Sequence, residues 1–254
     1  MCLINFQFHD HPNYKLIVVA NRDEFYDRKT EPARFWEDAP NLLAGRDLVG
    51  LGTWLGITKE GKFAALTNYR NPLEVGVGKI SRGEIVQKYL VGSLSSEEYL
   101  KSLDRDKEKY NGFNLILGNP EKLHYYNNIE GEITEIDPGT HGLSNKFLNT
   151  EWPKVIKGRE GLKAYSSSKK ELDLEGLFAI MKDAEVAMDD NLPNTGVGIE
   201  LERNLSPLFI KIPNYGTRCS TIVLIDHTNQ VMFAERTYLN GEFSSDKRFS
   251  FKLA

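Results

Sequence analysis

The sequence predicts an α+β protein built as a four-layer αββα sandwich of helix, sheet, sheet and helix. Blocks of short strand-like segments alternate along the chain with two separate blocks of helical segments. Strands that follow one another tend to pair antiparallel, and each sheet then needs helices over one face. The 254 residues contain no Pro-, Gly- or Ser-rich linker and no internal repeat. We therefore expect residues 1–254 to form a single domain.

The chain begins with a predicted β-hairpin. Residues 2–8 and 15–21 have the composition of strands and flank a polar turn. The second run is almost wholly apolar, as expected of a strand that is covered on both faces. Alternation along the first strand places Cys2 on the same face as Ile4 and Phe6. A sheet would therefore present Cys2 from a buried face.

The middle and end of the chain are expected to continue in the same way. After the hairpin we expect a loop that contains Pro32 and Pro40. A capping box headed by Ser81 predicts the start of one helix, and Ser95 or Ser96 predicts the start of a second. Residues 152–184 are expected to be mostly helical. The other expected strands lie at residues 53–58, 62–68, 113–117, 123–127, 133–136, 218–225 and 230–238.

Charge and composition exclude several classes of function. The net charge is −4 with both signs interspersed, so there is no electrostatic footprint for nucleic acid. No apolar run approaches the length of about 20 residues that a membrane span needs, and no secretory signal is apparent. We therefore expect a cytoplasmic protein in which Cys2 and Cys219 are free thiols. The pair His9 and His11 lacks a nearby third ligand, so no metal site is expected.

Cys2 follows the initiator methionine directly. The enzyme that removes Met1 requires a small second residue, and cysteine qualifies. Removal would leave one residue with both a thiol and a free α-amine, whose reference pKa values are about 8.5 and about 7.7–8.0. Because the amine can then take the proton of the thiol, Cys2 is a candidate nucleophile that carries its own base. A buried structural cysteine is the ordinary alternative.

Polar residues at the ends or edges of apolar strands are candidates for the same site, namely Arg22, Asp23, Asn68, Asn145 and Arg218. Asparagine amides can donate to an oxyanion, arginine favours a thiolate, and a carboxylate can orient an amine. Each also has an ordinary role, since strand-end asparagines form turns and Arg22 with Asp23 can be a solvated ion pair. Alternation predicts that Cys219 points away from Arg218 and packs in the core rather than pairing with Cys2.

A series of short motifs runs through nearly the whole chain in a fixed order. They are Met-Cys-Leu at the start, Ala-Asn-Arg-Asp-Glu-Phe at 20–25, Arg-Phe-Trp at 34–36, Ala-Gly-Arg-Asp at 44–47, Gly-Thr-Trp-Leu-Gly at 52–56, Leu-Thr-Asn-Tyr-Arg at 66–70, His-Gly-Leu-Ser-Asn at 141–145 and Thr-Arg-Cys-Ser-Thr at 217–221. This series resembles the NRDE family, whose animal members are called transport and Golgi organisation protein 2. The ordered series is specific, whereas the tetrapeptide Asn-Arg-Asp-Glu alone would not be.

The NRDE family in turn resembles the N-terminal nucleophile hydrolases, above all the cysteine branch with bile-salt hydrolase and penicillin V acylase. The resemblance implies an αββα fold with Cys2 as the nucleophile. It also implies the remaining site residues, which are Arg22 and Asp23 beside Cys2, Asn68 as an oxyanion donor, Asn145 as the second asparagine and Arg218 as the late arginine. In those hydrolases the Arg and Asp are separated by two residues, whereas here they adjoin. Either Asp23 or Glu24 therefore fills the carboxylate position.

The sequence is compatible with two functions. The first is an N-terminal cysteine hydrolase that acts on a non-peptide amide or acyl bond of an unknown small molecule and needs no cofactor. The second is a non-catalytic intracellular carrier of haem, a ligand to which the family has been linked, with a thiolate or histidine as axial ligand. The sequence has neither a Cys-Pro pair nor a Cys-x-x-Cys-His site, so such haem binding would be non-covalent. The substrate and the oligomeric state do not follow from the sequence.

We expect the mature chain to begin at Cys2, because a free α-amine is what makes this residue its own base. The intact mass of protein from native cells checks this expectation. Quantitative retention of Met1 would turn the amine into an amide, abolish its basicity and favour the carrier over the hydrolase.

Overall fold

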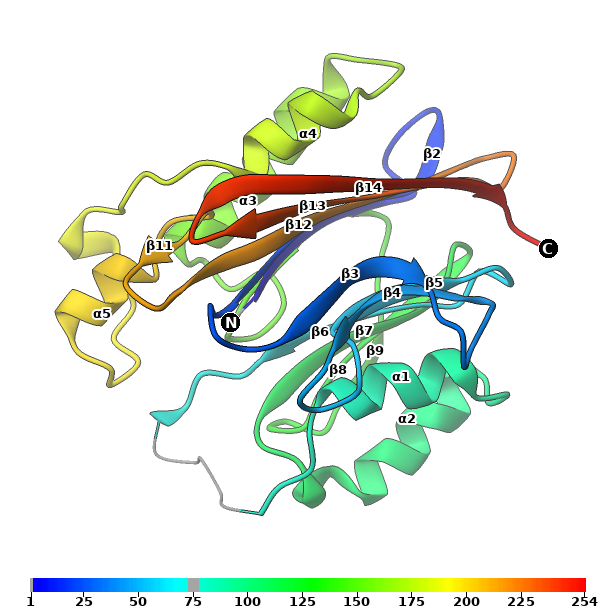
Figure 1. The fold of residues 1–254 in the computed structure, drawn as a ribbon, viewed down its shortest axis with the longest axis horizontal. Coiled ribbons are helices and arrows are strands. Elements are labelled where there is room, and N and C mark those ends of the chain that lie inside the picture. Colours follow the sequence, from blue (N-terminus) through cyan, green and yellow to red (C-terminus); the bar gives the residue numbers. More distant parts are fainter. Residues whose placement is uncertain (1, 73–77) are drawn as a thin grey trace. The chain divides into compact units, whose positions relative to one another are not determined.

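The structure, a computed structural model, describes residues 2–72 and 78–254 and contains two compact units (Figure 1). The first unit combines the N-terminal segment up to Asp27 with Pro138–Phe251. The second comprises Arg28–Asp137 together with Lys252–Ala254. The chain thus leaves the first unit after one hairpin and returns to it later. The expectation of a single domain over residues 1–254 stays a prediction.

The first unit is built on a sheet with the strand order β10–β1–β2–β12–β13–β14, and β11 lies beside β12. The pairs from β10 to β13 are antiparallel. Figure 1 shows α3 and α4 on one side of this sheet. The elements of this unit are β1 (Cys2–Phe8), β2 (Tyr14–Phe25), β10 (Gly139–Leu143), α3 (Pro153–Ser167), α4 (Leu174–Met181), η3 (Asp189–Asn191), α5 (Ile199–Asn204), β11 (Lys211–Ile212), β12 (Tyr215–Asp226), β13 (Gln230–Leu239) and β14 (Glu242–Lys252).

An apolar cluster joins this sheet to its helices. Leu3 of β1 and Val19 of β2 pack in the same cluster as Leu162 of α3 and Phe178 of α4. Because alternate residues of a strand point to opposite faces, Cys2 lies on the face turned away from these helices. β1 is buried along its whole length. The expected hairpin and the burial of both its faces are confirmed.

The second unit is built on an antiparallel sheet with the order β3–β4–β5–β6–β7–β8–β9, and α1 and α2 pack against it (Figure 1). Its core includes Trp36, Leu66 and Phe113 from the sheet side and Ile85 and Leu100 from the helices. The elements are β3 (Thr30–Phe35), β4 (Leu42–Asp47), β5 (Leu55–Thr58), β6 (Phe63–Asn68), α1 (Gly83–Val91), α2 (Ser96–Arg105), η2 (Lys107–Lys109), β7 (Phe113–Asn119), β8 (Lys122–Asn127) and β9 (Ile133–Glu135).

The helices and antiparallel sheets confirm the predicted α+β class. Across residues 2–72 and 78–254, no helix has both the length and the apolar character needed to cross a membrane.

Two local predictions are wrong, and one strand was not predicted. The expected loop around Pro32 is strand β3, which tolerates proline because β3 is an edge strand. The capping box at Ser81 does not form, since α1 has Arg82 as its N-cap and no side-chain cap. Ser95 instead caps α2 in a reciprocal box with Glu98. The polar residues after β13 form the edge strand β14, which the sequence did not predict.

An ion-pair network fastens α4 to the edge of the first sheet. Arg236 of β13 donates to Asp246 of β14 at 2.9 and 2.8 Å and to Glu175 of α4 at 3.1 and 2.9 Å. Its guanidinium also lies 4.2 Å from the ring centre of Phe178, a residue of the helix–sheet core. The hydrogen bond from Arg236 lowers the pKa of the Asp246 carboxyl. One side chain therefore links three elements.

We predict that Arg236→Met lowers the free energy of unfolding at pH 7 by about 1–3 kcal/mol, the range for hydrogen bonds to charged groups. A carboxyl whose pKa is lowered in the folded state stabilises that state above its unfolded pKa, and this contribution is lost as the pH falls through the folded pKa. The difference between wild type and variant should therefore shrink below about pH 3. Urea unfolding at both pH values measures it. As a control, Arg203→Met breaks an exposed pair with Asp189 and should leave the free energy of unfolding nearly unchanged.

Candidate functional site

Cys2 lies at one end of the first sheet, in a row of three paired residues. In the antiparallel pairing of β1 with β2, Cys2 faces Arg22, and in the pairing of β2 with β12, Arg22 faces Cys219. Directly paired residues of neighbouring strands point to the same side of a sheet. All three residues are buried, with Cys2 8%, Arg22 9% and Cys219 7% exposed. Cys2, Arg22 and Cys219 therefore share one buried face.

A β-bulge at Arg218 creates this arrangement. Thr217 pairs with Asp23 and Cys219 pairs with Arg22, so Arg218 is an extra residue and opposes Arg22 together with Cys219. Cys219 is buried in the core and is not paired with Cys2, as predicted, but its register also places it on the face that carries Cys2, because simple alternation does not hold across a bulge. Arg218 donates to the carbonyl oxygen of Phe25 at 2.7 Å. Burial and the nearby charge of Arg22 lower the pKa of Arg218.

Both cysteines are free thiols, as expected. Neighbouring strands lie about 4.8 Å apart, so the Cα atoms of Cys2 and Cys219, which are two strands apart, are separated by about 10 Å. Disulfide-linked Cα atoms lie about 4.4–6.8 Å apart. The two thiols cannot pair while β2 lies between them.

Asp23 is a buried carboxylate on the helix side of β2. It is 2% exposed and its Oδ1 accepts a hydrogen bond from the hydroxyl of Thr217 at 2.8 Å. Burial raises the pKa of the Asp23 carboxyl, whereas the charge of Lys154, the hydrogen bond from Thr217 and the charge of Arg22 oppose this rise. Lys154 is itself only 3% exposed and lies in the first turn of α3. The sequence analysis missed Lys154, because a lysine near the start of a helix gives no sign that it is buried.

The buried environment of Cys2 raises the pKa of its thiol. Burial raises the pKa of the thiol, and the negative charge of Asp23 raises it further, while Arg22 and a hydrogen bond from the Asp23 backbone N–H lower it. Of the two carboxylates left open by the sequence, Asp23 is thus the one whose charge acts on Cys2. Glu24 lies 3.9 Å from Arg22 and accepts from the backbone N–H of Phe25. Met1 lies outside the described residues, so its removal stays a prediction.

Ser144 lies between the backbone of Cys2 and the side chain of Asn145. The Ser144 hydroxyl oxygen lies 3.1 Å from the carbonyl oxygen of Cys2 and 3.1 Å from Oδ1 of Asn145, so its single proton can be donated to either acceptor. Ser144 follows directly on β10, whose register pairs Leu143 with Ile4 of β1. This register places Ser144 and Asn145 near the end of β1 at which Cys2 lies.

The remaining motif asparagines have different surroundings. Asn21, which precedes Arg22, is wholly buried on the helix face and donates to the carbonyl oxygens of Met181 and Leu208, both at 2.8 Å. Its Oδ1 accepts from Ser220 at 2.6 Å, so the Asn21 side chain links β2 to β12 and to the backbone at Met181 and Leu208. Asn68 belongs to the second unit, where it ends β6 and pairs with Phe113.

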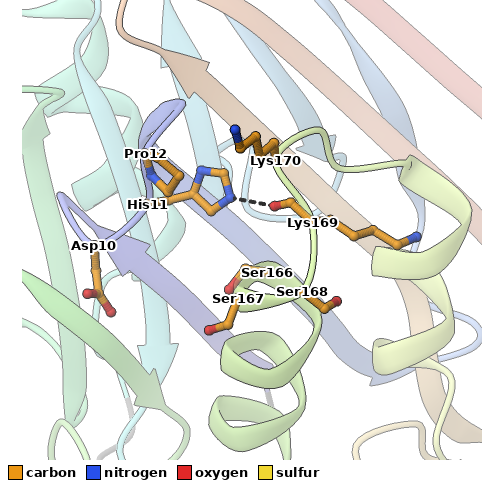
Figure 2. A pocket seen from close by; sticks show the side chains of 8 residues that line it. All are labelled: Asp10, His11, Pro12, Ser166, Ser167, Ser168, Lys169 and Lys170. Carbon is orange, nitrogen blue, oxygen red and sulfur yellow. Dashed lines mark hydrogen bonds between the residues drawn. The ribbon is translucent and has the colours of Figure 1, made fainter.

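A separate pocket of about 460 Å³ lies at the opposite end of the hairpin from Cys2, between its turn and the C-terminal end of α3 (Figure 2). His11 uses both ring nitrogens there: Nδ1 accepts from the backbone N–H of Asn13 at 3.1 Å, and Nε2 donates to the carbonyl oxygen of Lys169 at 3.1 Å. Ser166 and Ser167 donate to helix carbonyls. The contact of His11 with Lys169 joins the hairpin turn to the segment that follows α3, whereas the two serine contacts lie within α3. Among the described residues, no group of three or more His, Cys, Asp or Glu is placed to hold a metal ion.

Known proteins resemble this chain over almost its whole length. Residues 1–240 match the family described as Transport and Golgi organisation 2. The Transport and Golgi organization protein 2 homologue of Bos taurus is 36% identical and the alignment covers 95% of each chain. The Homo sapiens homologue is 35% identical, with 96% of this chain and 95% of the relative covered. The chain belongs to the Transport and Golgi organisation 2 family. The resemblance drawn from the sequence motifs is thereby confirmed.

Among solved structures, a variant of the conjugated bile acid hydrolase from Clostridium perfringens is similar with a TM-score of 0.52 at 10% sequence identity. The match covers 99% of this chain and 97% of the hydrolase chain. At such low identity the similarity shows the fold alone. It confirms the expected N-terminal nucleophile hydrolase-like fold for this family member.

We predict that Cys2 reacts with thiol electrophiles faster than Cys219 near pH 7. Burial raises the pKa of both thiols, but it raises that of Cys219 much further, and Glu235 adds to that rise. Site-resolved alkylation with iodoacetamide, quantified by mass spectrometry, measures both rates. Equal rates, or a faster Cys219, would remove the chemical support for Cys2 as a nucleophile.

We predict that Lys154→Met lowers the free energy of unfolding at pH 7 by about 3 kcal/mol, because one charge of a buried pair is then left alone. Burial already raises the pKa of Asp23, and loss of Lys154 raises it further. A carboxyl whose pKa is raised on folding destabilises the folded state as the pH rises through the unfolded value, so the deficit should shrink at acidic pH. Urea unfolding at pH 7 and pH 5 measures this. The double variant with Asp23→Asn should recover most of the loss, and no recovery would contradict the pairing.

Proposed function

We propose that the protein is an N-terminal cysteine hydrolase that acts on a non-peptide amide or acyl bond of a small molecule. The observation that carries the proposal is the convergence of Cys2, Arg22, Asp23 and Asn145 at one end of the first sheet. Support also comes from the fold, which is similar to that of a protein named for the hydrolysis of conjugated bile acids.

The raised pKa of Cys2 agrees with a mechanism in which the thiol is deprotonated only during attack. Once Met1 is removed, the α-amine of Cys2 takes the thiol proton as the sulfur attacks the substrate carbonyl. The new S–C bond gives a tetrahedral oxyanion. The amine then returns the proton to the leaving nitrogen or oxygen as the scissile bond breaks. Water hydrolyses the remaining thioester and releases the acid and the free thiol.

Charged neighbours fit this sequence of steps. Asp23 acts on Cys2 from the helix side of β2 and can hold the α-amine in its protonated form between the two proton transfers. Lys154 and Arg22 oppose the burial-driven rise in the pKa of Asp23, which favours its ionised form. Arg22 also favours a transient thiolate on Cys2. The roles of Asn68 and Asn145 as donors to the oxyanion, and of Arg218, follow from the family resemblance.

We predict that Cys2→Ala abolishes turnover of any acyl substrate of the wild type, and that Asn68→Ala lowers the rate by about 10²–10³-fold, as loss of an oxyanion donor does. Neither change removes a large apolar group, so both variants should fold. A panel of small-molecule amides and thioesters, with release of the leaving group as the readout, provides the measurement. Asn119→Ala is a matched control, because Asn119 also ends a strand and only accepts from the turn N–H groups of Glu121 and Lys122.

Haem titration of the same variants separates hydrolysis from haem carriage. A carrier should lose affinity only when an axial ligand or a residue that lines the haem pocket is changed. Tight haem binding that is lost in Cys2→Ala but kept in Asn68→Ala, without turnover of any amide or thioester, would reject the hydrolase proposal.

A further inference from the structure

Thr217 is a fully buried residue that lies directly before the β-bulge at Arg218 and pairs with Asp23 of β2. Its backbone N–H donates to the carbonyl oxygen of Ile210 at 2.8 Å, and its hydroxyl oxygen accepts from the backbone N–H of Ile210 at 2.9 Å. The same hydroxyl donates to Oδ1 of Asp23 at 2.8 Å. These three hydrogen bonds fix the Thr217 side chain between the Ile210 backbone and the Asp23 carboxylate.

The contacts also determine the direction of the hydroxyl proton of Thr217. A threonine hydroxyl has one proton to donate and two lone pairs that accept. The N–H of Ile210 is itself a donor, so the hydroxyl proton is directed to Oδ1 of Asp23. Oδ1 is therefore an acceptor in both protonation states of Asp23, and a proton that binds Asp23 is carried by Oδ2.

We propose that Thr217 is a positioning residue for the reaction at Cys2, and that its hydroxyl holds Asp23 as a carboxylate in which Oδ2 is the oxygen that binds a proton. The inference rests on the proposed hydrolase function. It names a residue that acts through Asp23 and does not itself touch the substrate.

Asp23 is coupled to Cys2 across the pairing of β1 with β2. Cys2 pairs with Arg22, the residue before Asp23, and the charge of Asp23 raises the pKa of the Cys2 thiol. Burial raises the pKa of the Asp23 carboxyl, and the hydrogen bond from Thr217 opposes this rise. Loss of the Thr217 hydroxyl should therefore raise the pKa of Asp23 further and reduce the negative charge that acts on Cys2.

Other charged and titratable groups act on Asp23 as well. They are Lys154 of α3, Arg22 of the same strand, the thiol of Cys2 on β1 and the phenol of Tyr26. The α-amine that maturation leaves on Cys2 belongs to the same surroundings. Because several groups titrate there, the titration of Asp23 is identified by its loss in Asp23→Asn.

Two readouts on the mature full-length protein test the inference. The first is the NMR signal of the Asp23 carboxyl carbon in protein that contains isotope-labelled aspartate, assigned by its absence in Asp23→Asn. Thr217→Val removes the hydroxyl at nearly constant volume. We expect it to raise the titration midpoint of Asp23 by about 1 pH unit, a tenfold change in proton affinity, as loss of one hydrogen bond to a charged group does.

The second readout is the pH profile of Cys2 alkylation by iodoacetamide, measured by site-resolved mass spectrometry. An ionised Asp23 raises the pKa of the thiol and thereby lowers the thiolate fraction. In Thr217→Val, Cys2 should react faster than in the wild type between the two midpoints of Asp23, and at the wild-type rate above both. Asp23→Asn should lose the inflection.

Thr217→Ser keeps the hydroxyl and should keep both wild-type profiles, which separates loss of the hydrogen bond from a general effect on folding. Ser220→Ala is the matched control. Ser220 is also fully buried on β12, but its hydroxyl donates to Oδ1 of Asn21 at 2.6 Å, so its loss should leave both profiles unchanged.

Three results would overturn the inference: an unchanged midpoint of Asp23 in Thr217→Val, a raised midpoint without a change in the Cys2 profile, or a midpoint in Thr217→Ser as high as in Thr217→Val. Failure of the proposed function has a different signature. The wild type then turns over no amide or thioester although both profiles shift as expected, and the role of Thr217 in catalysis is rejected together with the function.

Discussion

The register of the three central strands of the first sheet is the constraint on which the candidate site depends. Cys2, Arg22 and Cys219 form one cross-strand row, and a shift of one residue in either pairing would turn a member of the row to the other face. The row is fixed by the hairpin turn on one side and by the bulge at Arg218 on the other. Bulges are common next to active sites because they redirect a side chain without breaking the sheet.

Because side chains alternate along β2, the residues of the motif Asn21–Glu24 point to opposite faces of the sheet and have different roles. Asn21 and Asp23 lie on the helix side, where Asn21 clamps Met181 and Leu208 and Asp23 is near Lys154. Arg22 lies on the opposite face beside Cys2 and Cys219. One short segment thus anchors the helices and supplies charge to the thiol. A substitution at Asn21 should therefore act through stability, whereas one at Arg22 should act through the chemistry of Cys2.

The sequence predicts those features that depend on local patterns. The hairpin, most later strands and the helix that begins after Ser95 follow from alternation, turn residues and a capping box. It fails where tertiary context decides: β3 contains a proline because it is an edge strand, and the polar strand β14 is paired only once β13 is in place. The candidate residues on β1 and β2, and Asn145 shortly after β10, could be named from motifs. The position of Cys219 could not, because the bulge depends on how β12 pairs with β2. The burial of Lys154 could not be predicted for a similar reason, since it depends on the packing of α3.

The electrostatics of Cys2 bear on two ways in which a cysteine can act as a nucleophile in the proposed mechanism. A resting thiolate would need a net excess of positive influence, whereas here burial and Asp23 outweigh Arg22 and raise the pKa of the thiol. A protonated thiol needs a base within reach, and no histidine is required if the α-amine of the same residue is free. Removal of Met1 then does more than expose the thiol. In the proposed mechanism it creates the base, and Asp23 in its ionised form stabilises that base once it has taken the proton. Under the proposed mechanism, processing, the raised pKa of the thiol and the charge of Lys154 near Asp23 all serve proton transfer at Cys2.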